Sequence, residues 1–537
     1  MTILWKIHDE DPPKLNPPLF IFKRCKIAAA HDAKILESFD YDLNKVILQQ
    51  HPSQISYGSE FRPSSSLEGL LQDHPLWPRL KMILDEGAIF PLQAIDMKSR
   101  LLDLEFHLER GNHKSLEKYA EFIDPMISED VNRGFILPLP PEILPKLPGA
   151  SIAPLGCHKQ TTIDEEGNTI PKYRLTHDQS FPGPSGLSVN LRVKKDLLPP
   201  ILYSFVLSRL AHYIINTRLL HPDTRIYLCK VDLDATYRRC SLSSRTAMEC
   251  LTVYKDLLLV ALRLSFGGAP GPNLWGVISE SIADISNAIL QNNSWNYSTF
   301  FDPLSGTIEE PLSLPDDIPL ASAKKLSVPL PLNEKGYIDD NIGVTPDLGD
   351  NLLRMKRVIP LAIPTLARPL DKEDILPRKD IVSLKKFKAE GRLEEVKTVL
   401  GWIINTRTLT ISLSDDKLRN WGADISKMTS SKKAHYKILE STLGRLNHVA
   451  CVFNPMRHFM GRVYQALSQA SALGGWTRLS SEEVADLQTL SSFLSAANRG
   501  LSLNNLVYRK PTLLYRSDAS EFGIGGYNLK SGIAWRL

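Results

Sequence analysis

Apolar and polar residues alternate along this chain in periods that predict a mixture of helices and short strands. Apolar positions three and four apart predict an amphipathic helix over Lys98–Arg110. Shorter runs between prolines predict helical turns over Ser66–Gln72 and Pro78–Leu84. We therefore expect residues 1–133 to form a helical region, and their sequence assigns it no role.

Strand patterns become frequent in the second quarter of the chain. The proline-rich segment Leu137–Ala153 predicts extended backbone, and residues 156–190 alternate strand-like runs with Gly/Pro turns. Arg225–Asp232 and Leu257–Leu264 are further strand candidates. Between these strand patterns, a continuous apolar stripe predicts a long helix over Pro200–Leu219.

Helical patterns dominate the second half. Ser244–Tyr254 and Leu274–Leu290 are helix candidates, whereas residues 297–332 lack a clear period and suggest an insertion or hairpin region. Residues 352–510 are expected to be mainly helical, apart from a strand-like unit at Val399–Leu413.

Composition narrows the class of protein only slightly. The 537 residues suggest three or four domains or subdomains, and a net charge of +4 does not by itself indicate a nucleic-acid partner. The six cysteines form no CxxC pair, which argues against a zinc site or a disulfide framework. No apolar run approaches the length of a membrane span, and the N-terminus is no secretory signal. We expect a soluble intracellular protein, cytoplasmic and/or nuclear, with no membrane partner.

Two adjacent aspartates stand between apolar residues in the segment Tyr337-Ile338-Asp339-Asp340. The pattern predicts a tight β-hairpin that presents both carboxylates at its tip. Carboxylates this close repel each other unless a cation lies between them, and hard oxygen ligands suit Mg²⁺. The tetrapeptide alone is a weak signal, because any acidic turn can produce it.

A third aspartate, Asp232, ends the strand candidate Arg225–Asp232, and Tyr237 follows five residues later. Its ordinary role would be to cap a following helix. A two-metal phosphoryl-transfer site instead needs carboxylates from two separate strands, holding ions ~4 Å apart. Asp232 and the pair Asp339–Asp340 satisfy that requirement.

Two weaker signals accompany the aspartates. Lys172 and Arg174 lie on one face of a strand candidate, where a point charge and a planar guanidinium would suit a triphosphate. The Gly/Pro loop from Phe266 to Pro272 follows a strand and opens a helix, where backbone can approach a ligand closely. Taken alone, the first is ordinary surface charge and the second an ordinary loop.

The segment Lys427–Arg462 is strongly basic and predicts a surface that follows nucleic-acid phosphates, with a protein-binding face as the alternative. Its only acid is Glu440. Its basic residues are Lys427, Lys432, Lys433, Lys437, Arg445, Arg457 and Arg462.

In this order, the basic strand, first aspartate, Phe-Gly…Pro loop and Tyr-x-Asp-Asp resemble the reverse transcriptases of retroelements, especially LTR-type and DIRS-like elements. The resemblance runs from about Gly134 to Leu537. Within it, Leu400-Gly401-Trp402 to Leu413 is similar to the family's primer-grip hairpin. Residues 443–448 are similar to its thumb or connection helix.

The resemblance implies an RNA-directed DNA polymerase, a nucleotidyltransferase of a retrotransposon. Asp232, Asp339 and Asp340 would be catalytic and would hold two Mg²⁺ ions, or Mn²⁺, with help from the Leu233 carbonyl. Tyr237 would reject a ribose 2′-hydroxyl and so favour deoxynucleoside triphosphates. The partners would be an RNA or DNA template with its primer, and the oligomeric state is left open.

The resemblance also implies a nucleotide-binding set. Lys172 and Arg174 would hold the triphosphate, and Phe266 and Gly267 would lie beneath the incoming nucleotide. Pro272 and Trp275 would shape the helix that follows. The sequence departs from the family pattern at Ala235, where an acid is common, and at Gly268–Gly271, a smaller and more proline-rich loop than usual. Neither departure removes a metal ligand, but both bear on nucleotide affinity.

The end of the chain resembles the first strand and turn of a ribonuclease H domain. Leu513–Ser520 supplies the strand, with Asp518 as the first carboxylate, and the glycines Gly523, Gly525 and Gly526 supply the turn. That fold needs further acids from later strands, so we expect no hydrolytic activity. The ending suggests a fragment or a degenerate element copy.

The expected architecture is therefore an α+β right-hand polymerase. Fingers and an α/β palm with a small antiparallel sheet would occupy residues 134–350. The primer-grip hairpin and a helical thumb or connection would occupy residues 351–510, before the truncated ribonuclease H-like start at 511–537. Three alternatives stay open: an RNA-dependent RNA polymerase, a catalytically inactive retroelement-derived nucleic-acid-binding protein, and a helical protein with chance motifs.

Overall fold

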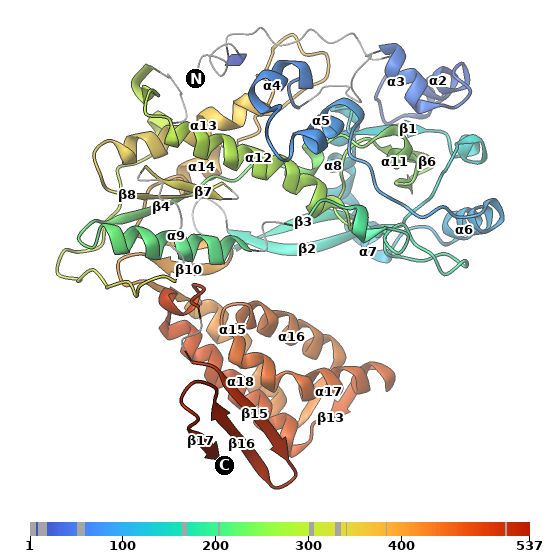
Figure 1. The fold of residues 1–537 in the computed structure, drawn as a ribbon. Coiled ribbons are helices and arrows are strands. Elements are labelled where there is room, and N and C mark those ends of the chain that lie inside the picture. Colours follow the sequence, from blue (N-terminus) through green and yellow to red (C-terminus); the bar gives the residue numbers. More distant parts are fainter. Residues whose placement is uncertain are drawn as a thin grey trace.

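The computed structural model shows a mixed α+β chain with several small antiparallel sheets (Figure 1). This confirms the expected α+β class. The structure describes residues 7–8, 19–50, 60–163, 169–201, 205–299, 305–327, 335–339, 341–382, 384–510 and 513–537.

The N-terminal region is helical in its described part, as the sequence predicts. Its helices are α2 (Lys26–Glu37), α3 (Leu43–Gln50), α4 (Ser64–Leu71), α5 (Trp77–Glu86), α6 (Met97–Arg110), α7 (Lys114–Lys118) and α8 (Ala120–Asn132). Buried side chains of several of these helices, such as Leu36, Leu67 and Leu80, join one hydrophobic core with residues as distant as Val358 and Leu393. The N-terminal helices are therefore part of the main body.

A three-stranded sheet lies at the centre of that body. Its strands are β4 (Ile226–Lys230), β8 (Ile342–Pro346) and β7 (Tyr337–Asp339), in the order β4-β8-β7 and antiparallel throughout. The helices α9 (Val206–Leu220), α12 (Gly271–Gln291) and α13 (Asn351–Leu366) contact it.

Alternating residues of β4 face two different cores, because successive side chains of a strand point to opposite faces. Ile226 and Leu228 pack in the same core as α9, whereas Tyr227 and Cys229 pack in the core that includes α12 and α13. The sheet is therefore covered on both faces, which explains the nearly continuous apolar run in its sequence.

A second sheet contains β1 (Ile136–Leu139), β6 (Leu257–Ala261) and β5 (Leu251–Tyr254) in the order β1-β6-β5. Here the helix expected over Ser244–Tyr254 is wrong in its second half, because α11 ends at Met248 and β5 begins at Leu251. The two residues Lys255 and Asp256 both have positive φ, 46° and 60°, as a two-residue hairpin turn requires. This turn pairs β5 with β6 and fixes the segment as a strand.

The antiparallel hairpin of β2 (Leu155–Ile163) and β3 (Thr169–His177) confirms the strand patterns expected over residues 156–190. On β3, Leu175 is buried and the ring of Tyr173 stacks on Phe122, with centroids 3.9 Å apart. Lys172 and Arg174 therefore share the opposite, exposed face, as predicted from their spacing.

A third sheet carries a helical bundle. Its strands are β9 (Val396–Val399), β10 (Trp402–Asn405), β11 (Thr410–Ser412) and β14 (Leu501–Ser502), in the order β14-β11-β10-β9. The chain leaves β11 to form α15 (Asp415–Ser431), α16 (Tyr436–Ala450), α17 (Gly461–Ala472) and α18 (Ser481–Arg499), then returns to pair β14 beside β11. The strand-like unit and the helices predicted for residues 352–510 are thus confirmed.

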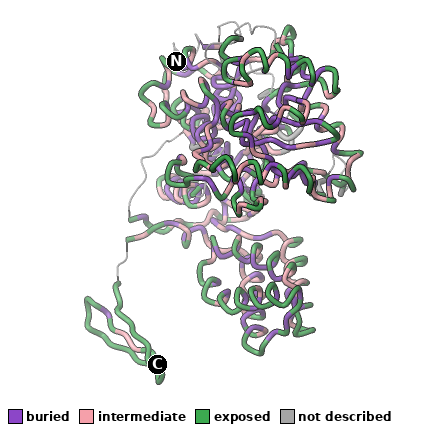
Figure 2. The backbone as a smooth tube through the Cα atoms, turned by 90° about the vertical axis from the view of Figure 1, so that its right-hand side faces the viewer, coloured by how far each residue is buried: buried purple, intermediate pink, exposed green. Residues whose placement is uncertain are grey.

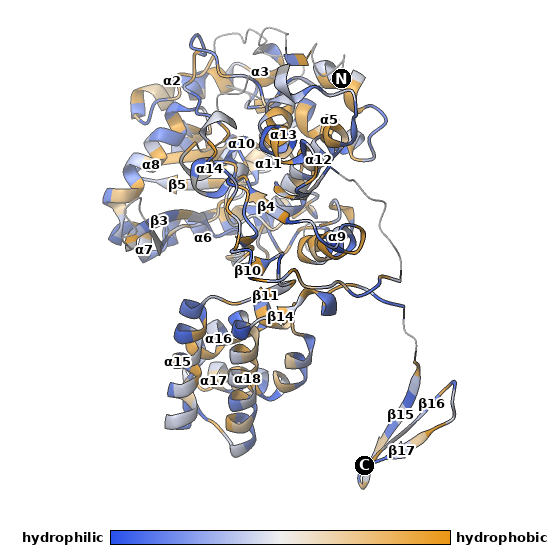
Figure 3. Cartoon of the chain, turned by 90° about the vertical axis from the view of Figure 1, so that its left-hand side faces the viewer, coloured by the Kyte–Doolittle hydropathy of each residue, from blue (hydrophilic) through white to orange (hydrophobic). Residues whose placement is uncertain are grey.

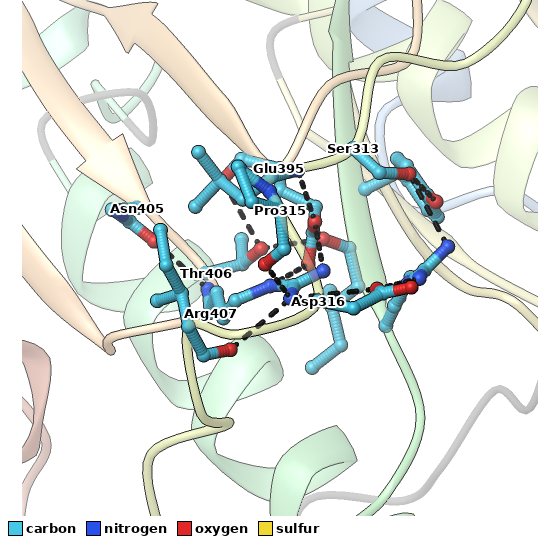
Figure 4. A network of polar contacts seen from close by, with 12 residues as sticks. Ser313, Pro315, Asp316, Glu395, Asn405, Thr406 and Arg407 are labelled. Carbon is cyan, nitrogen blue, oxygen red and sulfur yellow. Dashed lines mark hydrogen bonds and ion pairs between the residues drawn. The ribbon is translucent and has the colours of Figure 1, made fainter.

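A buried ion pair joins this sheet to the segment before β7. Arg407 bonds Glu395 through Nε to Oε1 at 3.0 Å and through Nη2 to Oε2 at 2.6 Å. Its Nη1 donates to the Pro315 carbonyl at 2.8 Å (Figure 4). The same nitrogen donates to the Ile318 carbonyl at 3.1 Å. Residues 315–318, within the described part of the expected insertion, are therefore held against the third sheet.

The C-terminal strands β15 (Tyr515–Ser520), β16 (Gly523–Asn528) and β17 (Ala534–Arg536) form a separate antiparallel sheet. It projects from the body, and most of its residues are exposed (Figures 2 and 3). Across the described residues, none of the helices combines the length and apolar character that crossing a membrane requires.

Candidate active site

Strand register brings the hairpin of β7 and β8 to the end of β4. Lys230 is paired with Ile342, which is paired on its other side with Asp339. Since neighbouring strands lie ~4.8 Å apart, the backbones at residues 339 and 230 are ~10 Å apart. The Val231 amide continues the ladder by donating to the Asn341 carbonyl at 3.0 Å. Only the backbone of Asp339 is described, and Asp340 lies outside the described residues.

Asp232 stands two residues beyond that pairing, with 32% of its side chain exposed. Lys230 Nζ lies 3.0 Å from Asp232 Oδ1 and 2.8 Å from Glu390 Oε2. Glu390 is the last residue of α14 (Leu384–Glu390). Partial burial lowers the pKa of Lys230, but the hydrogen bonds with Glu390 and Asp232 outweigh it, and the net pKa is raised. Lys230 is therefore an ammonium cation shared by two carboxylates.

The turn after Asp232 is held by a buried arginine. Leu233 is buried and forms an antiparallel β-bridge with Val382. Ala235 adopts a left-handed conformation with φ 52° just before α10 (Thr236–Arg239). Arg239 Nε donates to the Asp234 carbonyl at 2.8 Å, and its Nη1 lies 2.8 Å from Glu60 Oε2. A left-handed alanine costs free energy that the surrounding contacts must offset. Arg239 thus fixes the path of the chain leaving Asp232.

Glu60 is the shared partner of that buried arginine and two others. Arg133 and Arg378 lie 3.6 and 3.7 Å from its carboxylate oxygens, and only 1% of the Glu60 side chain is exposed. A buried ion pair holds its geometry strongly, because removing one partner leaves the other charged and desolvated. The N-terminal region therefore contributes directly to the support of the Asp232 turn.

The predicted nucleotide-binding residues form one continuous path. The Arg174 guanidinium lies 5.8 Å from the centre of the Phe266 ring, and the rings of Phe266 and Tyr237 are 5.4 Å apart. Phe266 is 40% exposed, so one aromatic surface faces solvent between Arg174 and Tyr237. Lys172 lies two residues before Arg174 on the same exposed face of β3.

Gly267 fixes the contact between this path and β3. Its φ is +122°, and a Cβ there would lie 1.7 Å from the carbonyl oxygen of His177. The His177 amide donates to the Phe266 carbonyl at 3.0 Å. Burial, with a smaller effect of Arg238, lowers the pKa of His177 to about 3, so its imidazole is neutral. Only glycine allows the loop to lie this close to the strand.

A cavity of about 610 Å³ lies in front of Asp232. Its wall includes Leu233, Thr236, Trp275, Glu390 and the turn residues Leu400 and Gly401. The turn predicted to resemble a primer grip therefore shares a cavity with the first aspartate. Lys417 Nζ donates to the Gly401 carbonyl at 2.5 Å and connects the turn to α15.

Sequence reasoning missed three of these residues. Lys230 stood inside the Asp232 motif without a role, and Glu390 lies in a run of mixed charge that usually indicates a solvated face. Nothing in the local sequence marks Glu60. All three act through contacts between distant segments, which a linear pattern does not encode.

The residues of the predicted basic surface are spread over α15, α16, α17 and the segments between these helices. Two of its seven basic residues form ion pairs: Arg445 pairs with Asp424, and Arg462 Nη1 lies 3.3 Å from Asp486 Oδ2. Both acids fall outside Lys427–Arg462, so the surface is less one-sided than the sequence count indicates.

Asp518 is not part of the site. It lies on β15, where its neighbours along the strand are exposed, and it pairs in register with Gly525. Among the residues whose side chains are described, no group of three or more His, Cys, Asp or Glu side chains is arranged to hold a metal ion.

No family model and no curated protein matches this sequence. The solved structures that are similar to the chain include three of the foamy viral protease-reverse transcriptase. The protease-reverse transcriptase dRH in complex with ds DNA is 15% identical in sequence, with a TM-score of 0.39, over 92% of this chain and 71% of that one. The complex with RNA/DNA hybrid is 16% identical in sequence, with a TM-score of 0.41, over 98% of this chain and 54% of that one. The complex with dsDNA is 14% identical, with a TM-score of 0.39, over 98% of this chain and 81% of that one. The chain thus spans about half of the second of these proteins, and the likeness is distant.

Proposed function

We propose that this chain is the polymerase part of an RNA-directed DNA polymerase that transfers nucleotides with two Mg²⁺ ions. The observation that carries the proposal is the register Lys230–Ile342–Asp339, which brings the end of β4 and the β7–β8 hairpin to the same end of one sheet. A two-metal site needs carboxylates from two separate strands at the same end of a sheet. The other predicted site residues can be assigned roles around this end of the sheet.

Asp232, Asp339 and Asp340, with the Leu233 carbonyl, would hold the metal ions. The donor chemistry fits, because carboxylate and carbonyl oxygens are hard ligands and the cavity beside Asp232 has room for hydrated ions. Bound there, the two ions would activate the primer 3′-hydroxyl and neutralise the departing pyrophosphate. The protein would contribute position and charge without a covalent intermediate.

The nucleotide would lie along the path from β3 to α10. Lys172 and Arg174 would bind its triphosphate, and Phe266 with Gly267 would lie against its base or sugar. Tyr237, whose ring contacts Phe266, would exclude a ribose 2′-hydroxyl. In this proposal β2–β3 belongs to the fingers, the β4-β8-β7 sheet to the palm, and α15–α18 to the thumb.

Primer extension on an RNA template, with deoxynucleotides and Mg²⁺, tests the proposal. Wild-type protein should extend the primer, and Asp339→Asn should not. Absence of extension by a folded wild-type protein that still binds primer–template would contradict the proposal and favour an inactive nucleic-acid-binding protein. A preference of the wild type for ribonucleotides would favour an RNA polymerase, and Tyr237→Ala should relax the sugar discrimination that we expect.

A further inference from the structure

The ammonium group of Lys230 contacts the carboxylates of Asp232 and Glu390. Lys230 is the last residue of β4, and Asp232 follows two residues later. The ammonium nitrogen is within 3.0 Å of Asp232 and 2.8 Å of Glu390. All three side chains are partly buried, with 24%, 32% and 39% exposed.

Glu390 is held in place by its own segment. Phe387, one turn earlier in α14, is 1% exposed in the main core. Gly391 directly after it has no room for a side chain, since a Cβ there would lie 2.5 Å from the Phe387 carbonyl oxygen. Phe387 thus anchors α14 in the core, and Glu390 at its end lies on the wall of the cavity.

The ionised groups around the cavity do not pair one to one. Glu394 has its own partner, because Lys397 Nζ lies 3.4 Å from Glu394 Oε2. Lys230 is then the shared partner of two carboxylates, Asp232 and Glu390. An ammonium and a divalent cation beside the same carboxylate repel each other, and this repulsion is strong where both are partly shielded from water.

We propose that Lys230 competes with the divalent cation for Asp232, and that Glu390 sets the metal affinity by offering Lys230 an alternative anion. On this view Lys230 and Glu390 are positioning residues, and neither binds the metal ion. The inference rests on the proposed function only in placing a cation at Asp232. It extends that function by assigning a regulator of the site.

Direct Mn²⁺ binding, measured by the loss of the free-ion electron paramagnetic resonance signal without nucleotide or template, tests the inference. Glu390→Gln should weaken binding roughly five- to tenfold, because Lys230 is left with Asp232 alone. Lys230→Met should tighten it by a similar factor. Lys230→Arg keeps the charge and should stay within about twofold of wild type.

The double variant Lys230→Met/Glu390→Gln separates the two possible roles of Glu390. If Glu390 acts through Lys230, its substitution should have almost no effect once Lys230 is gone. If Glu390 is itself a ligand, its substitution weakens Mn²⁺ binding equally in both backgrounds, and the inference is overturned. Unchanged binding in folded Glu390→Gln protein overturns it as well.

Two controls locate the measured ion. Asp256→Asn removes the carboxylate of an exposed pair with Lys26, 3.2 Å apart, and should leave Mn²⁺ binding unchanged. Asp232→Asn should abolish it, and unaltered binding in that variant would overturn the inference. Wild type that binds Mn²⁺ at Asp232 but extends no primer would contradict the proposed polymerase function alone, because the binding measurements do not depend on catalysis.

Discussion

Asp232 and Asp518 stand in similar stretches of sequence, each at a strand that a short turn follows, yet their surroundings differ completely. The strand before Asp232 is covered by helices on both faces, and the turn after it is held by the buried Arg239–Glu60 pair. Every residue of β15, which carries Asp518, is exposed. The contrast teaches that an acidic motif acquires a defined geometry only from the packing around it.

The largest expected effect is the difference in primer extension between variants of Asp232 and of Asp518. Asp232→Asn should reduce primer extension by roughly a thousandfold, since it removes a charge that acts on the reacting groups. Asp518→Asn should leave extension unchanged. Rates of single-nucleotide incorporation measure both, and equal losses in the two variants would contradict the comparison.

A smaller loss of activity is expected when the Phe266 loop is displaced from β3. Gly267→Ala places a Cβ against the His177 carbonyl, so the Phe266 loop must shift away from β3. We expect kcat/KM for the incoming nucleotide to fall by roughly a hundredfold. Gly276→Ala is the matched control, because a Cβ at that helical position meets nothing within 4 Å. A similar fall in both variants would show that contact with β3 is not the cause.

The free energy of unfolding should depend more on the buried Arg239–Glu60 pair than on an exposed ion pair. Arg239→Met leaves Glu60 without its closest cation and should lower the free energy of unfolding by about 3–5 kcal/mol. Arg419→Met removes an exposed pair with Asp416 and should change it by less than about 1 kcal/mol. Denaturant unfolding measures both, and an unaltered midpoint for Arg239→Met would contradict the assigned support.

The smallest effect should come from the C-terminal sheet. Removal of residues 511–537 should leave the unfolding midpoint of the remaining body unchanged, because no described element outside the sheet makes a substantial contact with it. Differential scanning calorimetry compares the two proteins. A marked fall in the midpoint would show that the sheet is part of the cooperative body.

The sequence predicts those parts of the site that depend on local pattern. The hairpin at Tyr337–Asp339 follows from two adjacent aspartates between apolar residues, and the shared face of Lys172 and Arg174 follows from strand periodicity. The nature of Ser244–Tyr254 did not follow, because a short apolar run suits a helix or a strand until its pairing partner is known.

Long-range ion pairs were beyond the same reasoning. Glu390 and Glu60 reach the site from segments far from Asp232, and their charges alone resemble ordinary surface residues. Arg445 and Arg462 belong to the predicted phosphate-binding surface, but acids on the helices α15 and α18 pair with them. Such partners are set by the packing of elements, which no single stretch of sequence records.

The α15–α18 bundle enters and leaves the third sheet through neighbouring strands. Ile411 on β11 is paired with Leu501 on β14, so the two ends of the long excursion between them lie side by side. A segment attached in this way behaves as an inserted module. Its length and surface can change over evolution, or be exchanged by design, while the sheet that carries it keeps the same strand order.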